Sequence, residues 1–410
     1  MKILVLTNLY PPHEIGGYEI RCRDVSERLR AAGHEIHILT SDYQARGRSA
    51  APDSAVTRQL RIHGMYGHPW LPIQRVHTLE KHNHDILRQT LAAVRPDLVH
   101  VWNMGGISKS LLLRIEATGI PVVYDVSDHW LAGSVRADVW LSWWNDRGSI
   151  SRTLARAALT LLGIRRLLEP STPTAPWTSL RFQRIYFCSA FMRDITAAQG
   201  APVAHAGVIH CGIDTAAFSL KTDHARFAKL LWVGRLAADK DPLTAIRALA
   251  AAHRAGLSEL TLDLYGHGDP AYIAELDAEI SALGLGGHVR RKLAPVEEMR
   301  RLYAQYDALL FTSNWGEPFA LTPLEAMASG LPVITSLDGG QAELARHGSN
   351  CLVAAAANPE LYATRIAELA AAPDLRAAIA ATGLAEVRTR FDIEPITRQI
   401  EAFLLASLTP

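Results

Sequence analysis

Residues 1–40 read MKILVLTNLYPPHEIGGYEIRCRDVSERLRAAGHEIHILT and contain two short apolar segments separated by a helical pattern. The apolar segments, residues 2–7 and 35–40, have the length and composition of buried strands. Between them, apolar and charged residues alternate at helical spacing over residues 18–32, and Gly33 supplies a C-terminal stop. The pattern predicts a strand–helix–strand unit, from which parallel sheets are built.

The same rhythm continues along the chain and then starts a second time. We expect a first series of strands at residues 2–7, 35–40, 59–63, 98–102, 122–126, 185–188 and 208–211. We expect a second series at residues 230–233, 261–265, 289–292, 308–311, 333–335 and 351–353. Strands that alternate with helices predict an α/β chain with two wound parallel sheets, each covered by helices.

The length of 410 residues exceeds the size at which one hydrophobic core stops growing, so we expect two domains. A polar segment at residues 214–228 separates the two series of strands, which places the domains at residues 1–216 and 217–390. Residues 391–410 follow a complete second sheet and are amphipathic. We expect them to form a helix that packs back on the first domain.

Residues 131–178 interrupt the rhythm and are interpreted as an insertion. They contain four of the nine tryptophans, and residues 152–168 are basic and apolar without a strand signal. A basic amphipathic helix of this kind either packs on its own domain or lies on an anionic membrane surface. Both interpretations stay open at this point.

Composition narrows the class of protein and its location. Lys plus Arg total 42 and Asp plus Glu total 41, which gives no electrostatic case for a nucleic-acid partner. Four scattered cysteines, at 22, 188, 211 and 351, form neither a zinc motif nor a disulfide framework. The first apolar run is too short for a signal peptide, and no run could span a bilayer. We expect a cytoplasmic protein, with peripheral contact to the inner membrane face as the open alternative.

Residues 317–325, EPFALTPLE, lie between the strand expected at 308–311 and a helix. Thr322, Pro323 and Glu325 fit a capping box in which Thr322 is the N-cap. Glu317 is left unexplained, and a loop carboxylate at the carboxyl edge of a parallel sheet lies where α/β folds bind ligands. Such a carboxylate can accept hydrogen bonds from sugar or ribose hydroxyls, while the amides of a helix N-terminus attract phosphate. The segment therefore predicts a ligand site.

The spacing of these two glutamates, together with four other segments, resembles family 4 of the glycosyltransferases. The other segments are YPPHEIGGYE at 10–19, VGRLAADKD at 233–241, YGHGD at 265–269 and DGGQAE at 338–343. Apart from the insertion, their order and spacing agree with the family across nearly the whole chain. The resemblance implies the GT-B fold: two Rossmann-like domains, a central cleft and a C-terminal helix that crosses back to the first domain.

The resemblance also implies a function. The enzyme would move a hexose, with retention of configuration and without a metal or other cofactor, from a nucleotide diphosphate sugar to a saccharide or lipid-linked saccharide. A UDP-sugar is favoured as donor over a GDP-sugar. Base, sugar, acceptor and linkage stay undetermined, because base recognition in such folds relies largely on backbone groups.

Roles for individual residues follow from the same resemblance. Arg235 and Lys240 would neutralise the donor diphosphate in place of a divalent ion, although a solvated surface pair is the alternative interpretation. Glu325 would hold the ribose hydroxyls, and Glu317 would contact the transferred sugar. The other implied donor contacts are Gly16, Gly17, Gly266, Leu293, Phe319, Ala320 and Leu321.

The sequence departs from the family pattern after the strand expected at 122–126. Family members commonly carry a His-Asp pair there, whereas this chain reads Ser127-Asp128-His129-Trp130. An alignment on Trp130 puts Ser127 in the histidine position, and a shift of two residues restores His129, which we favour as the fourth catalytic candidate. Ala320 replaces a usual glycine, which matters only if its φ is positive.

Two other classes of function were weighed. An epimerase of the same architecture would use carboxylates of the first domain and would lack the trio of Arg235, Lys240 and Glu325. A non-catalytic protein that binds sugar nucleotides would keep the site without turnover, and a donor hydrolysis assay separates it from an enzyme. A dehydrogenase fits the sequence poorly, because no Gly-x-Gly-x-x-Gly follows the first strand.

Overall fold

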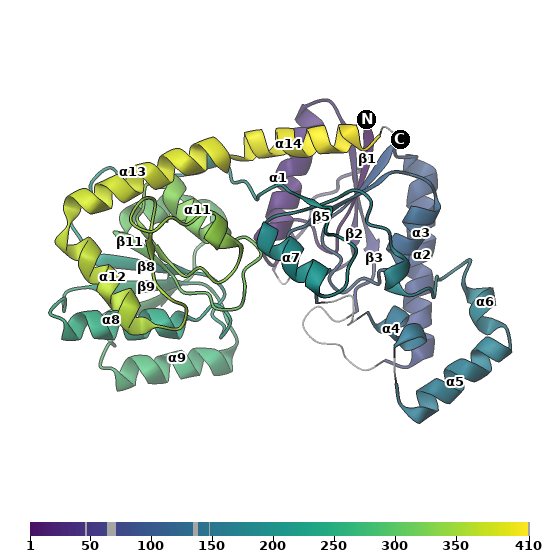
Figure 1. The fold of residues 1–410 in the computed structure, drawn as a ribbon, viewed down its shortest axis with the longest axis horizontal. Coiled ribbons are helices and arrows are strands. Elements are labelled where there is room, and N and C mark those ends of the chain that lie inside the picture. Colours follow the sequence, from purple (N-terminus) through teal and green to yellow (C-terminus); the bar gives the residue numbers. More distant parts are fainter. Residues whose placement is uncertain (46, 64–70, 134–137, 147, 409–410) are drawn as a thin grey trace. The chain divides into compact units, whose positions relative to one another are not determined.

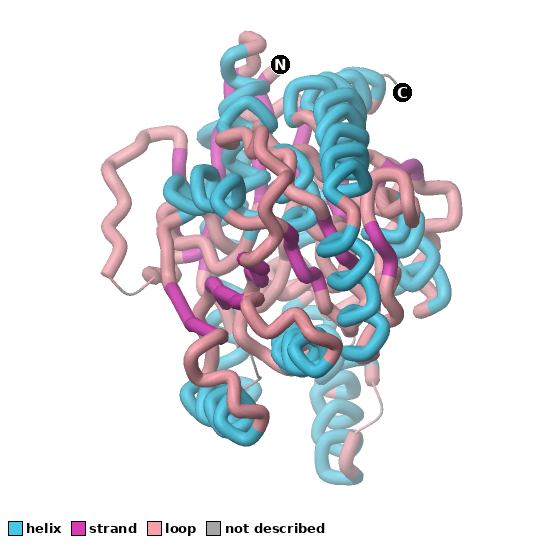
Figure 2. Tube along the Cα trace, turned by 90° about the vertical axis from the view of Figure 1, so that its left-hand side faces the viewer, coloured by secondary structure: helices cyan, strands magenta, loops and turns pink. Residues whose placement is uncertain are grey.

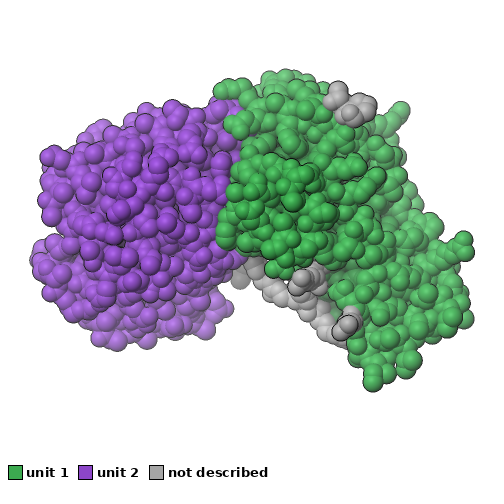
Figure 3. Space-filling model, viewed as in Figure 1, with its two compact units in different colours: residues 1–209, 397–410 green, residues 210–396 purple. Residues whose placement is uncertain are grey.

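The computed structural model describes residues 1–45, 47–63, 71–133, 138–146 and 148–408. The chain divides into two compact units (Figure 3), unit 1 with Met1–Ile209 and Thr397–Pro410, and unit 2 with His210–Ile396. The division falls after Ile209, whereas the sequence placed it after residue 216, and the chain returns to unit 1 at Thr397 rather than at residue 391. Residues 134–137 and 147 of the predicted insertion, and 409–410, lie outside the described residues.

Within its described residues, unit 1 is built on a seven-stranded parallel sheet in the order β3-β2-β1-β4-β5-β6-β7 (Figure 1). The strands are β1 (Lys2–Leu6), β2 (Glu35–Ser41), β3 (Val56–Leu60), β4 (Leu98–Val101), β5 (Val122–Val126), β6 (Ile185–Phe187) and β7 (Gly207–Val208). The helices are α1 (Gly17–Ala31), α2 (Ile73–Val94), α3 (Ser110–Ala117), α4 (Val139–Asn145), α5 (Ile150–Leu161), α6 (Ile164–Leu168) and α7 (Ala190–Ala198), with a 3₁₀ turn η1 (Trp177–Ser179).

Unit 2 has a six-stranded parallel sheet in the order β10-β9-β8-β11-β12-β13. The strands are β8 (Lys229–Val233), β9 (Thr261–Tyr265), β10 (Val289–Lys292), β11 (Ala308–Phe311), β12 (Val333–Thr335) and β13 (Leu352–Val353). The helices are α8 (Pro242–Arg254), α9 (Pro270–Ala282), α10 (Val296–Leu302), α11 (Leu321–Ala328), α12 (Pro359–Ala371) and α13 (Pro373–Arg390), and 3₁₀ turns are η2 (Thr215–Ala217), η3 (Tyr303–Gln305) and η4 (Gly340–Glu343). Helices pack along the strands of each sheet (Figure 2).

Every strand expected from the sequence is present, because each central strand is buried on both faces and therefore reads as a continuous apolar run. Residues 3–6 of β1 are fully buried. The predicted bounds were wrong for β3, which occupies Val56–Leu60 instead of residues 59–63, and for β7, which occupies Gly207–Val208 instead of residues 208–211. In β3, Val56 and Thr57 pair with Ile38 and Leu39 of β2, and the β-branched side chains of Val56 and Thr57 suit a strand.

The capping box at the start of α11 was also wrong. The helix begins at Leu321, its N-cap is Ala320, and no side chain caps it. Thr322 therefore lies inside the first turn and cannot act as the N-cap. Pro323 lies in the first turn as well, where its missing amide proton costs no helical hydrogen bond.

The last helix, α14 (Ile393–Ala406), leaves unit 2 and ends in unit 1. Ile400 and Leu404 are fully buried, and the Phe403 ring meets the Tyr186 ring edge-on at 5.2 Å between centroids. His34 Nε2 lies 2.7 Å from Glu401 Oε1. The apolar face that the sequence indicated thus packs on the first sheet's unit.

Candidate functional site

The order of the second sheet defines where its ligand site forms. From β8 the chain moves outward to β9 and β10, then returns to the other side of β8 as β11. The loops that follow β8 and β11 therefore leave the sheet in opposite directions, which opens a crevice at its carboxyl edge. Arg235 and Lys240 lie on the first of these loops, and Glu317 lies on the second.

These two loops are tied together by hydrogen bonds. The Asn314 amide donates to the Asp239 carbonyl at 3.1 Å, and the Ser313 hydroxyl oxygen lies 3.2 Å from the same carbonyl oxygen. The Thr312 hydroxyl donates to the Asp241 carbonyl at 2.7 Å. Asp241, which has a positive φ of 51°, also caps α8 by accepting from the Thr244 amide at 3.0 Å. The network fixes the two loops relative to each other.

Lys240 and Glu317 form an ion pair across the two loops. The Ser313 hydroxyl donates to the same Glu317 oxygen at 2.6 Å, and the Lys240 ammonium lies 4.9 Å from the centre of the Trp315 ring. Arg235 is held on its own loop by Asp239, at 2.6 Å. Both cations proposed for the diphosphate thus lie on the loop after β8, and each is paired with a carboxylate that an anionic ligand would displace.

Three glycines bring the loops around this crevice into backbone contact. A Cβ atom on Gly266 would lie 1.8 Å from the Gly234 carbonyl oxygen. One on Gly339, where φ is 125°, would lie 2.4 Å from the backbone nitrogen and oxygen of Glu317. A Cβ atom on Gly268 would lie 2.2 Å from the Leu236 carbonyl oxygen. Gly266, a predicted donor contact, therefore has a structural reason to be glycine.

The remaining predicted donor contacts of unit 2 lie on and around α11. Phe319, Ala320 and Leu321 form its N-terminus, and the φ of Ala320 is −75°, so that alanine brings no strain. Glu325 accepts a hydrogen bond from the Tyr303 hydroxyl at 2.6 Å, and burial raises the pKa of its carboxyl. Leu293 is 75% exposed in the loop after β10.

Unit 1 repeats the arrangement, because its sheet reverses direction between β1 and β4. Gly16 is the N-cap of α1, and Gly17 is its first residue. The Gly16 amide donates to the Glu19 carboxylate at 2.9 Å, and burial raises the pKa of Glu19 to about 7. The two predicted glycines thus expose backbone at the switch point of the first sheet.

The two candidates for the histidine position differ in their surroundings. Arg21 and Asp125 form a buried ion pair at 2.9 Å. The Ser127 hydroxyl accepts from Arg21 at 2.9 Å and donates to Asp125 at 2.5 Å, so it is part of this buried network. His129 is half-buried, and its backbone amide donates to the Asp128 side chain at 2.6 Å. The ring of His129 remains our candidate.

A polar cavity of about 250 Å³ lies at the same edge of the first sheet, beside the loop that follows β2. It is lined by His13, Asp42, Tyr43, Gln44, Arg48, Ser49, Ala50 and Arg58. Arg58 donates to the carbonyls of Tyr10 and Pro11 at 2.9 and 2.6 Å, which secures the loop after β1. Carboxylate, amide and guanidinium groups together suit a ligand rich in hydroxyls.

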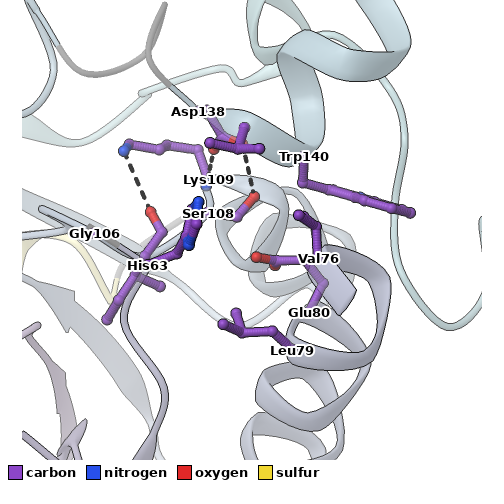
Figure 4. A pocket seen from close by; sticks show the side chains of 11 residues that line it. His63, Val76, Leu79, Glu80, Gly106, Ser108, Lys109, Asp138 and Trp140 are labelled. Atoms are coloured by element: carbon purple, nitrogen blue, oxygen red, sulfur yellow. Dashed lines mark hydrogen bonds between the residues drawn. The ribbon is translucent and has the colours of Figure 1, made fainter. Parts of the chain in front are cut away.

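A second cavity, of about 30 Å³, lies between α2, the loop after β4 and the start of α4 (Figure 4). It holds at most a few water molecules and is too small for a sugar. Lys109, Glu80 and Asp138 are all buried around it. Burial, and next the charge of Asp138, raise the pKa of Glu80 to about 8 against the opposing effects of Ser110 and Lys109.

This carboxyl predicts a pH dependence of stability. A raised folded-state pKa means that the folded chain binds a proton that the unfolded chain releases, so the stabilisation is lost as pH rises through about 8. The Glu80→Gln variant keeps a side-chain oxygen that accepts from the Ser110 hydroxyl, but its amide does not ionise in this pH range. We expect its free energy of unfolding, relative to the wild type, to rise by about 3 kcal/mol between about pH 6 and pH 9. Urea unfolding at both pH values measures this; equal differences at both would contradict it.

Among the residues that the structure describes, no group of three or more His, Cys, Asp or Glu side chains could hold a metal ion. Within the same residues, no helix has the length and apolar character needed to cross a bilayer.

Two units with wound parallel sheets, and a cationic and acidic site at the carboxyl edge of the second, define the architecture of a GT-B glycosyltransferase. A model of Glycosyltransferase Family 4 matches residues 15–217, and one of Glycosyl transferases group 1 matches residues 221–384. The chain belongs to family 4 of the glycosyltransferases, so the family, the fold class and the enzyme class predicted from the sequence are confirmed.

Relatives and solved structures agree with this assignment. The glycogen synthase of Mycobacterium tuberculosis is 28% identical over 378 residues, which are 85% of this chain and 81% of that protein. A D-inositol 3-phosphate glycosyltransferase of Frankia alni is 26% identical over 90% of this chain and 89% of its own. Anabaena Alr3699/HepE in complex with UDP-glucose has a TM-score of 0.68 at 20% identity, covering 99% of this chain and all of that one. WaaG has a TM-score of 0.66 at 17% identity, with 98% and 99% covered.

Sequence reasoning missed two residues that position the predicted site, Ser313 and Tyr303. Ser313 lies four residues before Glu317 and could have been noticed as a neighbour on the same loop. Tyr303 follows α10 and reaches Glu325 only because that segment packs against α11. No local pattern marks such a contact.

Proposed function

We propose that this glycosyltransferase moves a hexose from a UDP-sugar, with retention and without a metal, to a saccharide or lipid-linked saccharide acceptor. The observation that carries the proposal is the Lys240–Glu317 pair, with Arg235 beside it, at the switch point of the second sheet. The proposal is supported by HepE, which has the same fold and was solved in complex with UDP-glucose, and by the relatives named glycogen synthase and D-inositol 3-phosphate glycosyltransferase.

In the proposed donor complex, Lys240 and Arg235 bind the diphosphate oxygens and stabilise the charge that develops when the bond between the sugar C1 and the diphosphate breaks. The bonding electrons leave with the diphosphate. The acceptor hydroxyl attacks C1 from the same face, and its proton passes to an oxygen of the leaving group. Glu317 accepts from sugar hydroxyls, the amides at the start of α11 donate to that sugar, and Glu325 accepts from the ribose.

For the acceptor we propose the polar cavity of about 250 Å³ in unit 1. Asp42, Gln44 and Arg48 offer acceptors and planar donors of the kind that bind sugar hydroxyls. Because the residues that line this cavity belong to unit 1, whereas Lys240 and Glu317 belong to unit 2, changes in the cavity should affect KM for the acceptor and leave binding of the donor intact.

The test begins with donor choice. The purified chain is incubated with UDP-, GDP- and ADP-glucose, and its melting temperature is measured with and without EDTA. We expect UDP-glucose to raise the melting temperature most, since a ligand that binds only the folded state stabilises it. Transfer to saccharide acceptors should persist in EDTA, and NMR of the product should show the anomeric configuration of the donor. Loss of transfer in EDTA, or an inverted product, would overturn the mechanism.

A further inference from the structure

The α5–α6 hairpin, residues 150–168, carries an unusual surface within unit 1. Ile150 is 81% exposed, Leu154 is 66% exposed and Leu161 is 88% exposed. They follow one another at spacings of four and seven residues, so they form one stripe along α5. Leu162 and Leu167 are 74% and 73% exposed beside them. Large apolar side chains grouped in this way on a surface mark an interaction site.

The other side of the hairpin holds it to the domain. Leu159 and Leu168 pack against the buried cluster of Val76, Trp140, Leu141 and Trp144. Arg156 donates to the carbonyls of Trp144 and Asp146 at 3.1 and 2.8 Å, and Arg152 donates to Ser142. These are the last carbonyls of α4, where cations are favoured. The apolar stripe is therefore on the side of α5 that faces away from α4. Figure 1 shows α5 and α6 at the edge of unit 1.

The charge of the α5–α6 hairpin indicates which kind of surface the apolar stripe contacts. Residues 150–168 contain four arginines, at 152, 156, 165 and 166, and no Asp or Glu. The arginines on the inner side of α5 lie roughly 10 Å, the diameter of one helix, from the surface that the stripe would contact. This distance is about one Debye length at physiological salt. An apolar stripe backed by cations only is the pattern of a helix that lies in the interface of an anionic bilayer.

Self-association fits the same surface less well. In a two-fold dimer the same patch meets itself, so the positive charge behind one stripe would face the like charge behind the other, with no Asp or Glu in residues 150–168 to offset it. The hairpin also has fewer residues than the roughly 20–30 per partner of a standard protein interface.

We propose that the α5–α6 hairpin docks this enzyme on an anionic membrane surface, with Ile150, Leu154 and Leu161 inserted among the headgroups. The proposal goes beyond the reaction and stands independently of it, since membrane docking requires no turnover. It places the enzyme at a surface where a lipid-linked acceptor would be found.

The test measures co-sedimentation of the full chain with vesicles of phosphatidylcholine alone and of phosphatidylcholine with phosphatidylglycerol. We expect binding to the anionic vesicles, weakened by added salt. The double variant Leu154→Glu/Leu161→Glu should bind at least tenfold more weakly. Leu154→Ser/Leu161→Ser, which adds no negative charge, should also lose most of the binding. The matched control is Leu405→Glu, an exposed leucine of the same unit on α14, which should bind as the wild type does.

All substituted side chains are exposed, so melting temperatures should stay within a few degrees of the wild type, and UDP-glucose should shift them equally in all variants. Equal binding to neutral and anionic vesicles, or wild-type binding by both hairpin variants, would overturn the proposal. A concentration-dependent dimer that the hairpin substitutions abolish, without vesicle binding, would overturn it in favour of self-association.

Discussion

The Lys240→Ala variant is expected to lose about 100- to 1,000-fold in kcat/KM for the donor while remaining folded. Removing one preorganised charge from a site of developing negative charge has an effect of this size in other enzymes. In this protein the loss is compounded, because Glu317 loses its ion-pair partner and would then face the diphosphate as an uncompensated carboxylate. Donor affinity should fall together with the rate.

Titration calorimetry with UDP and steady-state kinetics with the preferred donor measure both effects. Lys229→Ala is the matched control, since Lys229 is an exposed lysine at the amino end of β8, the strand whose carboxyl end leads to Lys240. Lys240→Arg keeps the charge and should recover part of the activity. If Lys240→Ala bound UDP with wild-type affinity, the assignment of the diphosphate site would be wrong.

The second large effect is expected from Glu325→Gln. A neutral amide accepts weaker hydrogen bonds from the ribose than a carboxylate does, and hydrogen bonds to charged groups contribute about 1.5–3 kcal/mol. We therefore expect affinity for UDP-glucose to fall by about 10- to 100-fold, and affinity for glucose 1-phosphate, which has no ribose, to stay unchanged. An equal loss for both ligands would show that Glu325 acts on the fold of the site rather than on the ribose.

Tyr303→Phe tests how Glu325 is held. It removes the hydroxyl that donates to the carboxylate at 2.6 Å and leaves the ring packed. We expect roughly a tenfold loss of UDP affinity, intermediate between wild type and Glu325→Gln. Glu275→Gln, at an exposed position on α9, is the control for loss of a carboxylate and should bind normally.

Glu325 also provides a pH signature. Burial raises the pKa of this carboxyl. As the pH falls, the ionised carboxylate that accepts hydrogen bonds from the ribose is therefore protonated at a higher pH than an exposed glutamate would be. UDP affinity of the wild type should thus weaken as the pH falls, and that dependence should be reduced in Glu325→Gln.

Much of the molecule could be predicted from its residues alone. Strands such as β1, β5 and β11 are buried on both faces, so their apolar character is local and can be recognised without neighbours. Family membership followed from the order of short motifs around Lys240, Glu317 and Glu325. The errors came where local signals compete, as at β3, where a strand could be placed in either of two adjacent windows, and at α11, where a Thr-Pro pair resembled a helix start.

By itself, then, the sequence determined the alternation of strands and helices, the two sheets and the chemical types of the proposed site residues, because these depend on side-chain character and spacing within a few positions. Tertiary structure alone decided which distant groups meet: Lys240 with Glu317, Tyr303 with Glu325, and Arg21 with Asp125 beneath Ser127. It also decided that the apolar face of α5 points outward. Such contacts depend on how elements pack against one another, and a periodic pattern reports that a helix has two faces without saying which of them the domain covers.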